Sequence, residues 1–332
     1  MAVFRDTTRK LDITRPPARG SDQYRDLVQG LLSAPKRIPS KYFYDAAGSE
    51  IFSAIMKCPE YYLTACEDEI LRENAHALVR ACARDRRLNI VELGAGDGTK
   101  TRHLLREAQN AGLMVSYAPI DISNGALKQL ETNLAAELEG VVYNPIALDL
   151  ERELSLLPLS SDAQNLILYL GSSIGNLLPT EQAAFLTELR RTMDFGDHLL
   201  VGFDLKKPCE ILMPAYNDGA GWTREFNLNI LRRLNRELNA DFNVEAFKHQ
   251  PLYNPKNGAM ESWLISMAKQ HVHLWHLGVT IEFKAFEAIQ TETSWKFSHD
   301  EIETLAACAG FHRVDKFTDR RGWFNDELWR KE

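Results

Sequence analysis

A short apolar segment that runs directly into closely spaced glycines is the feature that most constrains this fold. Residues 89–93 have the composition of a buried strand, and Gly94, Gly96 and Gly98 follow at once, before a segment with helical spacing. Glycine lets the backbone approach a ligand closely, and the first N–H groups of the next helix are free to bind it. The sequence therefore predicts a strand, a ligand-binding turn and a helix, in that order.

The same alternation of strand and helix recurs through the middle of the chain. Further apolar strands are expected at residues 115–120, 141–148, 165–170 and 198–205, with helices at 126–137 and 181–193. Repeated βα units of this kind are typical of a parallel sheet that is covered by helices on both faces. The predicted fold class is therefore α/β.

The segments on either side of these units have a different pattern. A polar, basic arm, expected to be frayed, at residues 1 to about 20 precedes expected helices at 23–32, 49–56 and 67–83. From about residue 207, an expected helix at 226–238 is followed by strand-like segments near 246–253, 262–268 and 271–283. A capped helix that stops at Gly310 and two strands at 311–317 and 323–328 then complete the first sheet with a hairpin.

The composition limits the possible partners and compartments. Lys and Arg number 39 against 46 Asp and Glu, so the net charge of −7 argues against nucleic acid or an anionic membrane surface as a partner. No apolar run approaches the roughly 18 residues of a spanning helix, and the N-terminal arm lacks the apolar region of a secretion signal. The 5 cysteines are scattered without a C-x-x-C pair, which indicates reduced thiols and a cytoplasmic protein.

The glycine turn favours an S-adenosyl-L-methionine site over a dinucleotide site. The dinucleotide fingerprint needs a small residue at its sixth position, where this chain has Thr99, and here Glu92 stands two residues before the first glycine. Asp121 and Asp149 close the next two strands, at the edge where open α/β sheets bind ligands. We expect Asp121 to accept hydrogen bonds from ribose hydroxyls and Asp149 to meet the adenine amino group, with helix capping as the alternative role of each.

Other polar and aromatic residues are candidates for a second ligand. Asn176 follows the fourth strand and can accept from an ammonium or donate when the amine is free, although a turn role is the alternative. Tyr44 and Tyr61 belong to an aromatic-rich stretch that fits either a core or a pocket. The histidines at 271, 273 and 276 lack carboxylate or thiol neighbours at ligand spacing, so no metal site is expected.

Several longer motifs point to a known family. They are K-Y-F-Y-D-A-A-G-S-E-I-F (41–52), P-E-Y-Y-L-T (59–64), V-E-L-G-A-G-D-G-T-K-T-R (91–102), Y-L-G-S-S-I-G-N-L (169–177), A-Y-N-D-G-A-G-W-T-R-E-F-N-L-N (215–229), N-R-E-L-N-A-D-F (235–242) and T-E-T-S-W-K-F (291–297). In this order, from about residue 25 to 330, the chain resembles the histidine-specific methyltransferases, which make histidine betaine in ergothioneine biosynthesis.

The resemblance implies a Rossmann-like class I methyltransferase sheet and a second, mixed α+β substrate domain. On this basis residues 1–64 and 207–296 form the substrate domain, and residues 65–206 and 297–332 form the cofactor-binding domain. It also implies a set of residues for each ligand. The S-adenosyl-L-methionine site would comprise Gly94, Gly96, Lys100, Asp121 and Asp149. The amine and carboxylate of the amino acid would meet Tyr44, Tyr61, Asn176, Tyr216 and Thr223, with Asn176 and Tyr44 at the reacting amine, and the imidazole would meet Glu292 and Ser294.

One position departs from the family pattern. Where the family usually has methionine beside the substrate side chain, this chain has Ser262, within the segment M-E-S-W-L (260–264). Ser262 is therefore expected to line the substrate pocket and to change its wall. The expected activity is transfer of up to three methyl groups to the α-amino group of free histidine, without a metal and with the amine proton lost to solvent. The alternatives are an indole amino acid as substrate, a non-catalytic amino-acid sensor, and an NAD-linked oxidoreductase, which Thr99 disfavours.

Overall fold

The computed structural model describes residues 21–83, 86–150 and 152–332, and the arm expected at residues 1–20 lies outside this part. An eight-stranded sheet forms its centre, in the order β13-β14-β7-β6-β2-β3-β4, with β5 also paired to β3. The strands are β2 (Arg87–Leu93), β3 (Met114–Asp121), β4 (Val142–Tyr143), β5 (Ile146–Ala147), β6 (Gln164–Tyr169), β7 (His198–Asp204), β13 (Phe311–Thr318) and β14 (Phe324–Lys331).

The pairing in this sheet confirms the α/β class. Strands β2 to β7 all run parallel, and β14 and β13 close the sheet as an antiparallel hairpin beside β7. The single strand expected at 141–148 is wrong, because the structure has two short strands, β4 and β5, on either side of Asn144 and Pro145. Proline has no N–H to donate, so it interrupts the ladder at that point.

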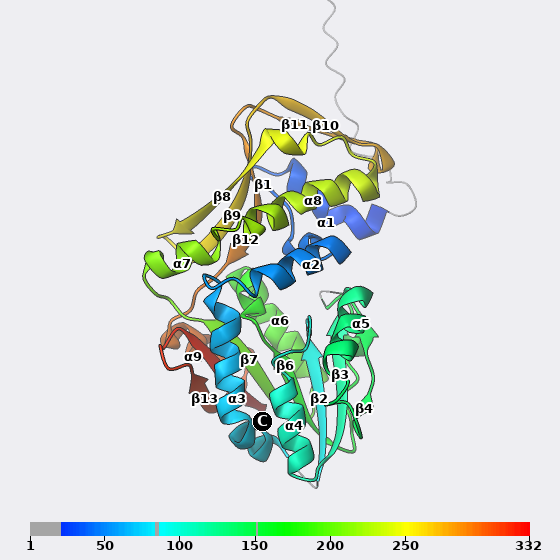
Figure 1. Ribbon diagram of the computed structural model, residues 1–332, viewed down its shortest axis with the longest axis vertical. Coiled ribbons are helices and arrows are strands. Elements are labelled where there is room, and N and C mark those ends of the chain that lie inside the picture. Colours follow the sequence, from blue (N-terminus) through cyan, green and yellow to red (C-terminus); the bar gives the residue numbers. More distant parts are fainter. Residues whose placement is uncertain (1–20, 84–85, 151) are drawn as a thin grey trace, which may run out of the picture.

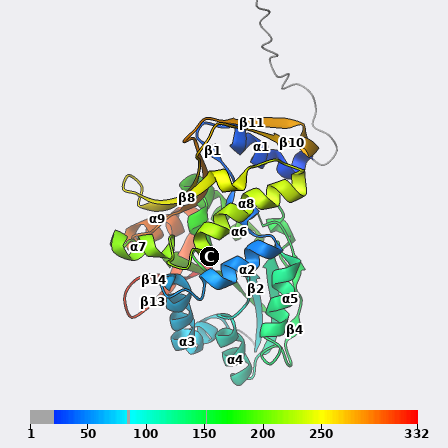
Figure 2. The same ribbon diagram turned by 45° about the horizontal axis from the view of Figure 1, so that its top comes forward.

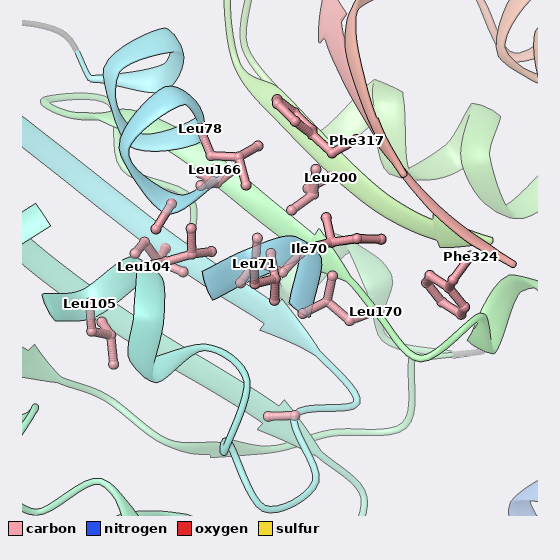
Figure 3. Close-up of a cluster of buried hydrophobic side chains, with 14 of the residues drawn as sticks. Ile70, Leu71, Leu78, Leu104, Leu105, Leu166, Leu170, Leu200, Phe317 and Phe324 are labelled. Carbon is pink, nitrogen blue, oxygen red and sulfur yellow. The ribbon is translucent and has the colours of Figure 1, made fainter. Parts of the chain in front are cut away.

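Helices cover both faces of the large sheet. On one face lie α3 (Tyr62–Cys82), α4 (Arg102–Asn110) and α5 (Asn124–Asn133), and on the other lie α6 (Pro179–Thr192) and α9 (His299–Ala309). Figure 3 shows the core beneath α3 and α4, where Ile70, Leu71 and Leu104 meet Leu166 and Leu200 of the sheet. Both layers are therefore anchored by apolar side chains that are fully removed from water.

A smaller sheet and three helices lie beyond the large sheet, at the top of Figures 1 and 2. The strand order is β1-β12-β9-β8, and a separate hairpin pairs β10 with β11. The elements are β1 (Lys36–Arg37), β8 (Phe247–Asn254), β9 (Ala259–Ser266), β10 (Gln270–Leu274), β11 (Val279–Phe283), β12 (Ala288–Ser294), α1 (Arg25–Leu32), α2 (Ala46–Ile55) and α8 (Trp222–Leu238), and α7 (Cys209–Ala215) connects this layer to β7. The stacked rings of Phe43 and Phe226, 4.3 Å apart, fix α8 against the N-terminal segment.

Several expected helix bounds shift for identifiable reasons. The helix expected at 49–56 begins at Ala46, because the Asp45 carboxylate accepts the Gly48 N–H at 2.7 Å and caps it. The helix expected at 67–83 begins at Tyr62, directly after the Pro59 turn. The single strand expected at 271–283 is the β10–β11 hairpin, which turns at Gly278 with φ of +64°.

Among the described residues, none of the helices combines the length and the apolar character that crossing a bilayer would require.

Candidate functional site

The glycine turn forms as the sequence predicts, between β2 and α4. Gly94, Gly96 and Gly98 all have positive φ, of +67°, +57° and +68°. A Cβ on Gly94 or Gly96 would meet nothing within 4 Å, whereas one on Gly98 would lie 2.7 Å from the Leu130 side chain. The first two glycines therefore border open space, where a ligand can approach the backbone, and the third allows the turn to pack against α5.

Asp121 stands at the end of β3, directly beside this turn. Its carboxylate accepts the Gly96 N–H at 3.1 Å and the Ser123 N–H at 2.8 Å. Burial raises the pKa of Asp121, and these two N–H groups act in the opposite direction. Asp121 is thus held at the sheet edge, and each oxygen keeps a lone pair for a further donor.

Asp149 lies at the same edge, two residues past the end of the neighbouring strand β5. Residue 121 pairs with Ala147 across β3 and β5, so Asp149 follows two residues beyond that pair. Its carboxylate lies 3.8 Å from the Arg152 guanidinium and remains partly exposed. The structure thus brings both predicted acidic residues to one side of the glycine turn.

Lys100 is bound to an acidic residue that sequence reasoning missed. Its ammonium forms an ion pair with Glu67 of α3, a carboxylate that is fully buried. Glu67 also accepts the Gly171 N–H with both oxygens, at 2.7 and 3.0 Å. The signal was present in the sequence, because Glu67 occupies an apolar-face position of its helix between Leu63 and Ile70. A charge at such a position requires a buried partner.

Glu92, which the motif spacing singled out, bonds to the chain itself. Its carboxylate accepts hydrogen bonds from the hydroxyls of Thr101, at 2.7 Å, and Tyr117. Burial raises the pKa of Glu92 to about 7, against the lowering effect of these two hydroxyls. Glu92 therefore fastens the segment after the glycine turn to β2 and β3.

Two of the predicted tyrosines, Tyr44 and Tyr61, pack against the core of the smaller sheet, and Tyr61 also packs against the core of the large sheet. Tyr44 packs edge-on against Phe226, with ring centroids 5.7 Å apart, and Tyr61 packs edge-on against Phe52 at 6.0 Å. Burial raises the pKa of Tyr44, and the charges of Glu292 and Asp121 raise it further. Both phenols stay protonated at neutral pH.

Glu292 and Ser262 face each other across the β9–β12 ladder. The Ser262 hydroxyl donates to the Glu292 carboxylate at 3.0 Å, and Ser262 is fully buried. Burial raises the pKa of Glu292, while Ser262 and the charge of Lys296 lower it. The residue that departs from the family pattern is thus in direct contact with the carboxylate expected to bind the imidazole.

Ser294 and Tyr216 meet beside Glu292, and both contact a buried lysine. The Tyr216 hydroxyl donates to Ser294 Oγ at 2.8 Å, and Lys296 lies 2.6 Å from Tyr216 Oη and 2.9 Å from Ser294 Oγ. Lys296 also pairs with Asp204 at 2.7 Å. Sequence reasoning missed Lys296 and Asp204. The sequence feature that could have indicated a buried lysine is the position of Lys296 between the aromatic residues Trp295 and Phe297.

Asn176 ends a short 3-10 helix (Ser173–Asn176) that packs against the end of β12. The Trp295 N–H donates to Gly175 O at 2.8 Å, and a Cβ on Gly175 would lie 2.8 Å from Trp295 O. Only glycine permits this close approach. A cavity of about 640 Å³ opens beside it, with Asn176 and Glu292 in its lining together with Arg37 and Phe185. Asn176 and Glu292 therefore share one space.

Thr223 is more constrained than the resemblance implies. Its N–H and its hydroxyl both donate to the same Asp218 oxygen, at 2.7 and 2.6 Å. The hydroxyl proton is therefore occupied, and Thr223 could meet a ligand only as an acceptor.

A metal has no evident place in this arrangement. Within residues 21–83, 86–150 and 152–332, no group of three or more His, Cys, Asp or Glu side chains is placed to hold a metal ion.

The sequence has clear relatives. Residues 23–331 match a family described as histidine-specific methyltransferase, SAM-dependent. The chain is 40% identical over 304 residues to a histidine N-alpha-methyltransferase of Mycobacterium tuberculosis, which covers 92% of this chain and 93% of that protein. It is 39% identical, with the same coverage, to the protein of that name from Mycolicibacterium smegmatis. Ergothioneine biosynthesis protein 1 of Neurospora crassa is 29% identical over 86% of this chain and 32% of that longer protein.

Proposed function

The chain belongs to the family of histidine-specific, SAM-dependent methyltransferases, and from that premise we propose that it methylates the α-amino group of free histidine, up to the trimethyl stage. The single observation that carries the proposal is the cavity of about 640 Å³ that Asn176 and Glu292 line together. The group proposed for the amine and the group proposed for the imidazole therefore face the same space.

The residues at the glycine turn fit S-adenosyl-L-methionine. The open space over Gly94 and Gly96 admits the methionine part, and the lone pairs of Asp121 suit the ribose hydroxyls. Asp149 would meet the adenine, and Lys100 would meet the methionine carboxylate. The bound cosubstrate supplies an electrophilic methyl group on a sulfonium. The remaining task of the protein is to align an amine with that methyl group and to exclude water.

The substrate side supplies polar but uncharged groups for the amine. Tyr44, Tyr61 and Asn176 would orient the nitrogen. Tyr216 and Thr223, whose hydroxyl protons are donated to Ser294 and Asp218, would line the site without donating to the substrate carboxylate. An ammonium has no lone pair, so the amine must lose its proton before each transfer. The high pKa values of Tyr44 and Tyr61 keep both phenols neutral, so neither is a base at neutral pH. We infer that the proton leaves to solvent, through the cavity beside Asn176.

We propose that two parts of the chain divide the work. Residues 65–206 and 297–332 would bind the cosubstrate, and residues 1–64 and 207–296 would bind the amino acid. This division is supported by the separate sheets and by the origin of the proposed ligand-binding residues. Asp121 ends a strand of the large sheet and Lys100 lies in the turn after β2, whereas Glu292 and Ser262 come from the small sheet.

A direct assay tests the proposal. The protein is incubated with S-adenosyl-L-methionine and each free amino acid in turn, and products are read by mass spectrometry. We expect histidine to gain one, two and three methyl groups in succession. Histidine left unmodified, or a better turnover of tryptophan than of histidine, would contradict the proposed substrate.

A further inference from the structure

Lys296 is a buried cation beside the proposed substrate site that the mechanism above does not use. Its side chain has no exposed surface and pairs with Asp204, which also accepts the Tyr62 hydroxyl and pairs with Lys207. Burying a charge is costly unless it is paired, and the Asp204 carboxylate pairs with the Lys296 ammonium at 2.7 Å. An ammonium can donate hydrogen bonds but cannot accept any.

The three protons of this ammonium are all engaged. Among the described residues, their acceptors are Asp204 Oδ2 at 2.7 Å, Tyr216 Oη at 2.6 Å and Ser294 Oγ at 2.9 Å. Because both hydroxyl oxygens accept from Lys296, each hydroxyl must direct its own proton to another acceptor. The geometry of one ammonium thus restricts two hydroxyl groups.

One of these two protons lies between the hydroxyls themselves. Tyr216 Oη and Ser294 Oγ are 2.8 Å apart, which leaves room for a single hydrogen bond. The phenol is the more acidic of the two hydroxyls and the better donor, so Tyr216 donates to Ser294. Ser294 then retains one proton, and no described residue accepts it.

We propose that Lys296 is a positioning residue that commits Ser294 to donate its proton to the ring of the substrate. The inference rests on the proposed function and deepens it. A neutral imidazole has one N–H and one bare nitrogen. The Glu292 carboxylate accepts the N–H, and Ser294, two residues along β12, donates to the bare nitrogen.

Two histidine analogues separate the two ring contacts. A pyrrole analogue keeps an N–H but has carbon in place of the bare nitrogen, and both of its isomers are assayed. A thiazole analogue keeps a bare nitrogen but has no N–H. In the wild-type protein the Ser294 proton meets a carbon in the pyrrole analogue, and an unmet buried donor is unfavourable. We therefore expect histidine to be preferred to both analogues in kcat/KM.

Replacing Lys296 should relax only one of these preferences. In Lys296→Met, Tyr216 still donates to Ser294, but the Ser294 proton is free to turn to the position that the ammonium vacates, and Asp204 keeps Lys207 and Tyr62 as partners. The preference for histidine over the pyrrole analogue should fall roughly 3- to 10-fold, the worth of one neutral hydrogen bond. The preference over the thiazole analogue, which depends on Glu292, should not change. Lys296→Gln, whose amide can donate to the hydroxyls, should restore part of the first preference.

Lys207→Met is the matched control. It also removes a lysine that is bound to Asp204, but Lys207 contacts Tyr62 and Leu205 O instead of Ser294 and Tyr216. Both preferences should stay at their wild-type values. If Lys296→Met does not fold, Lys296→Gln takes its place, and the preference over the pyrrole analogue should then fall by a smaller factor.

The outcomes distinguish the two proposals. An unchanged preference over the pyrrole analogue, in a folded variant without Lys296, overturns the role of Lys296. A wild-type protein that does not methylate histidine overturns the proposed function instead. If turnover of the variants is too slow to measure, equilibrium titration of histidine, the pyrrole analogues and the thiazole analogue gives the same comparison.

Discussion

Ser262 and Glu292 are direct neighbours across the β9–β12 ladder, and the Ser262 hydroxyl donates a 3.0 Å hydrogen bond to the Glu292 carboxylate. Methionine, the residue that the family resemblance led us to expect at position 262, has no proton to offer a carboxylate. Ser262 therefore acts on the carboxylate that we propose for ring binding and not only on the width of the pocket. This contact leads to the first two predictions.

The Glu292 carboxylate should decide the choice of substrate. We expect Glu292→Ala to lower kcat/KM for histidine roughly 10- to 150-fold, the equivalent of about 1.5–3 kcal/mol for a hydrogen bond to a charged group. Ser262→Met should change selectivity less, because the carboxylate remains. The measurement is a competition assay among histidine, tryptophan, tyrosine and phenylalanine. A histidine preference that survives Glu292→Ala would exclude Glu292 from ring recognition.

The pH profile should report the same contact. Burial raises the pKa of Glu292 above its usual 4.5, and the Ser262 hydrogen bond opposes that rise. The ionised carboxylate accepts a ring N–H more strongly than the protonated acid does, so kcat/KM falls as the pH drops through this pKa. Ser262→Ala removes the opposing bond, and the acidic limb of the profile should therefore move to higher pH. Titration of free histidine is identical for both proteins and cancels in the comparison. Superimposable profiles would show that Ser262 does not act on Glu292.

Binding of S-adenosyl-L-methionine is predicted to depend on Asp121. We expect Asp121→Ala to weaken binding of S-adenosyl-L-methionine by about 1.5–3 kcal/mol, measured by titration calorimetry. Asp121→Asn is the matched variant, since its amide oxygen can still accept the Gly96 N–H and hold the turn. A smaller loss in Asp121→Asn than in Asp121→Ala is the expected order. Unchanged affinity in the alanine variant would remove Asp121 from the site.

Turnover of the amine is predicted to depend on Asn176. We expect Asn176→Ala to lower turnover in all three methylation steps and to leave S-adenosyl-L-methionine affinity nearly intact, because Asn176 shares its cavity with Glu292. Single-turnover mass spectrometry and calorimetry measure the two effects. A collapse of cosubstrate affinity would mean that the two half-sites are wrongly assigned.

The sequence was sufficient for the large sheet because its signals are local. The length of each apolar segment predicts the length of its strand. Gly94, Asp121 and Gly171, at the ends of these segments, mark the edge of the sheet where a ligand is expected. The strand at 141–148 was predicted wrongly because one proline divides it into two short strands. The prediction was based on the apolar residues alone and did not take this proline into account.

The contacts that organise the site could not be predicted in the same way. Glu67 and Lys100 are 33 residues apart, and Tyr62 and Asp204 are 142 apart. Such pairs are set by how α3 packs across the sheet, which no local pattern encodes. The register of β9 against β12, which decides that residue 262 meets Glu292, depends equally on the tertiary fold.

Helix α3 contacts both the proposed cosubstrate site and the proposed amino-acid site. Tyr61 precedes its first turn, and Glu67, six residues on, holds both Lys100 and the backbone that leads to Asn176. A ligand that displaced Lys100 would, through this helix, also displace Tyr61, which we propose at the amine. Thermodynamic reciprocity would then require the methyl donor and the amino acid to alter each other's affinity by the same factor. Retention of a partly methylated amine between rounds would therefore depend on whether a new methyl donor has arrived.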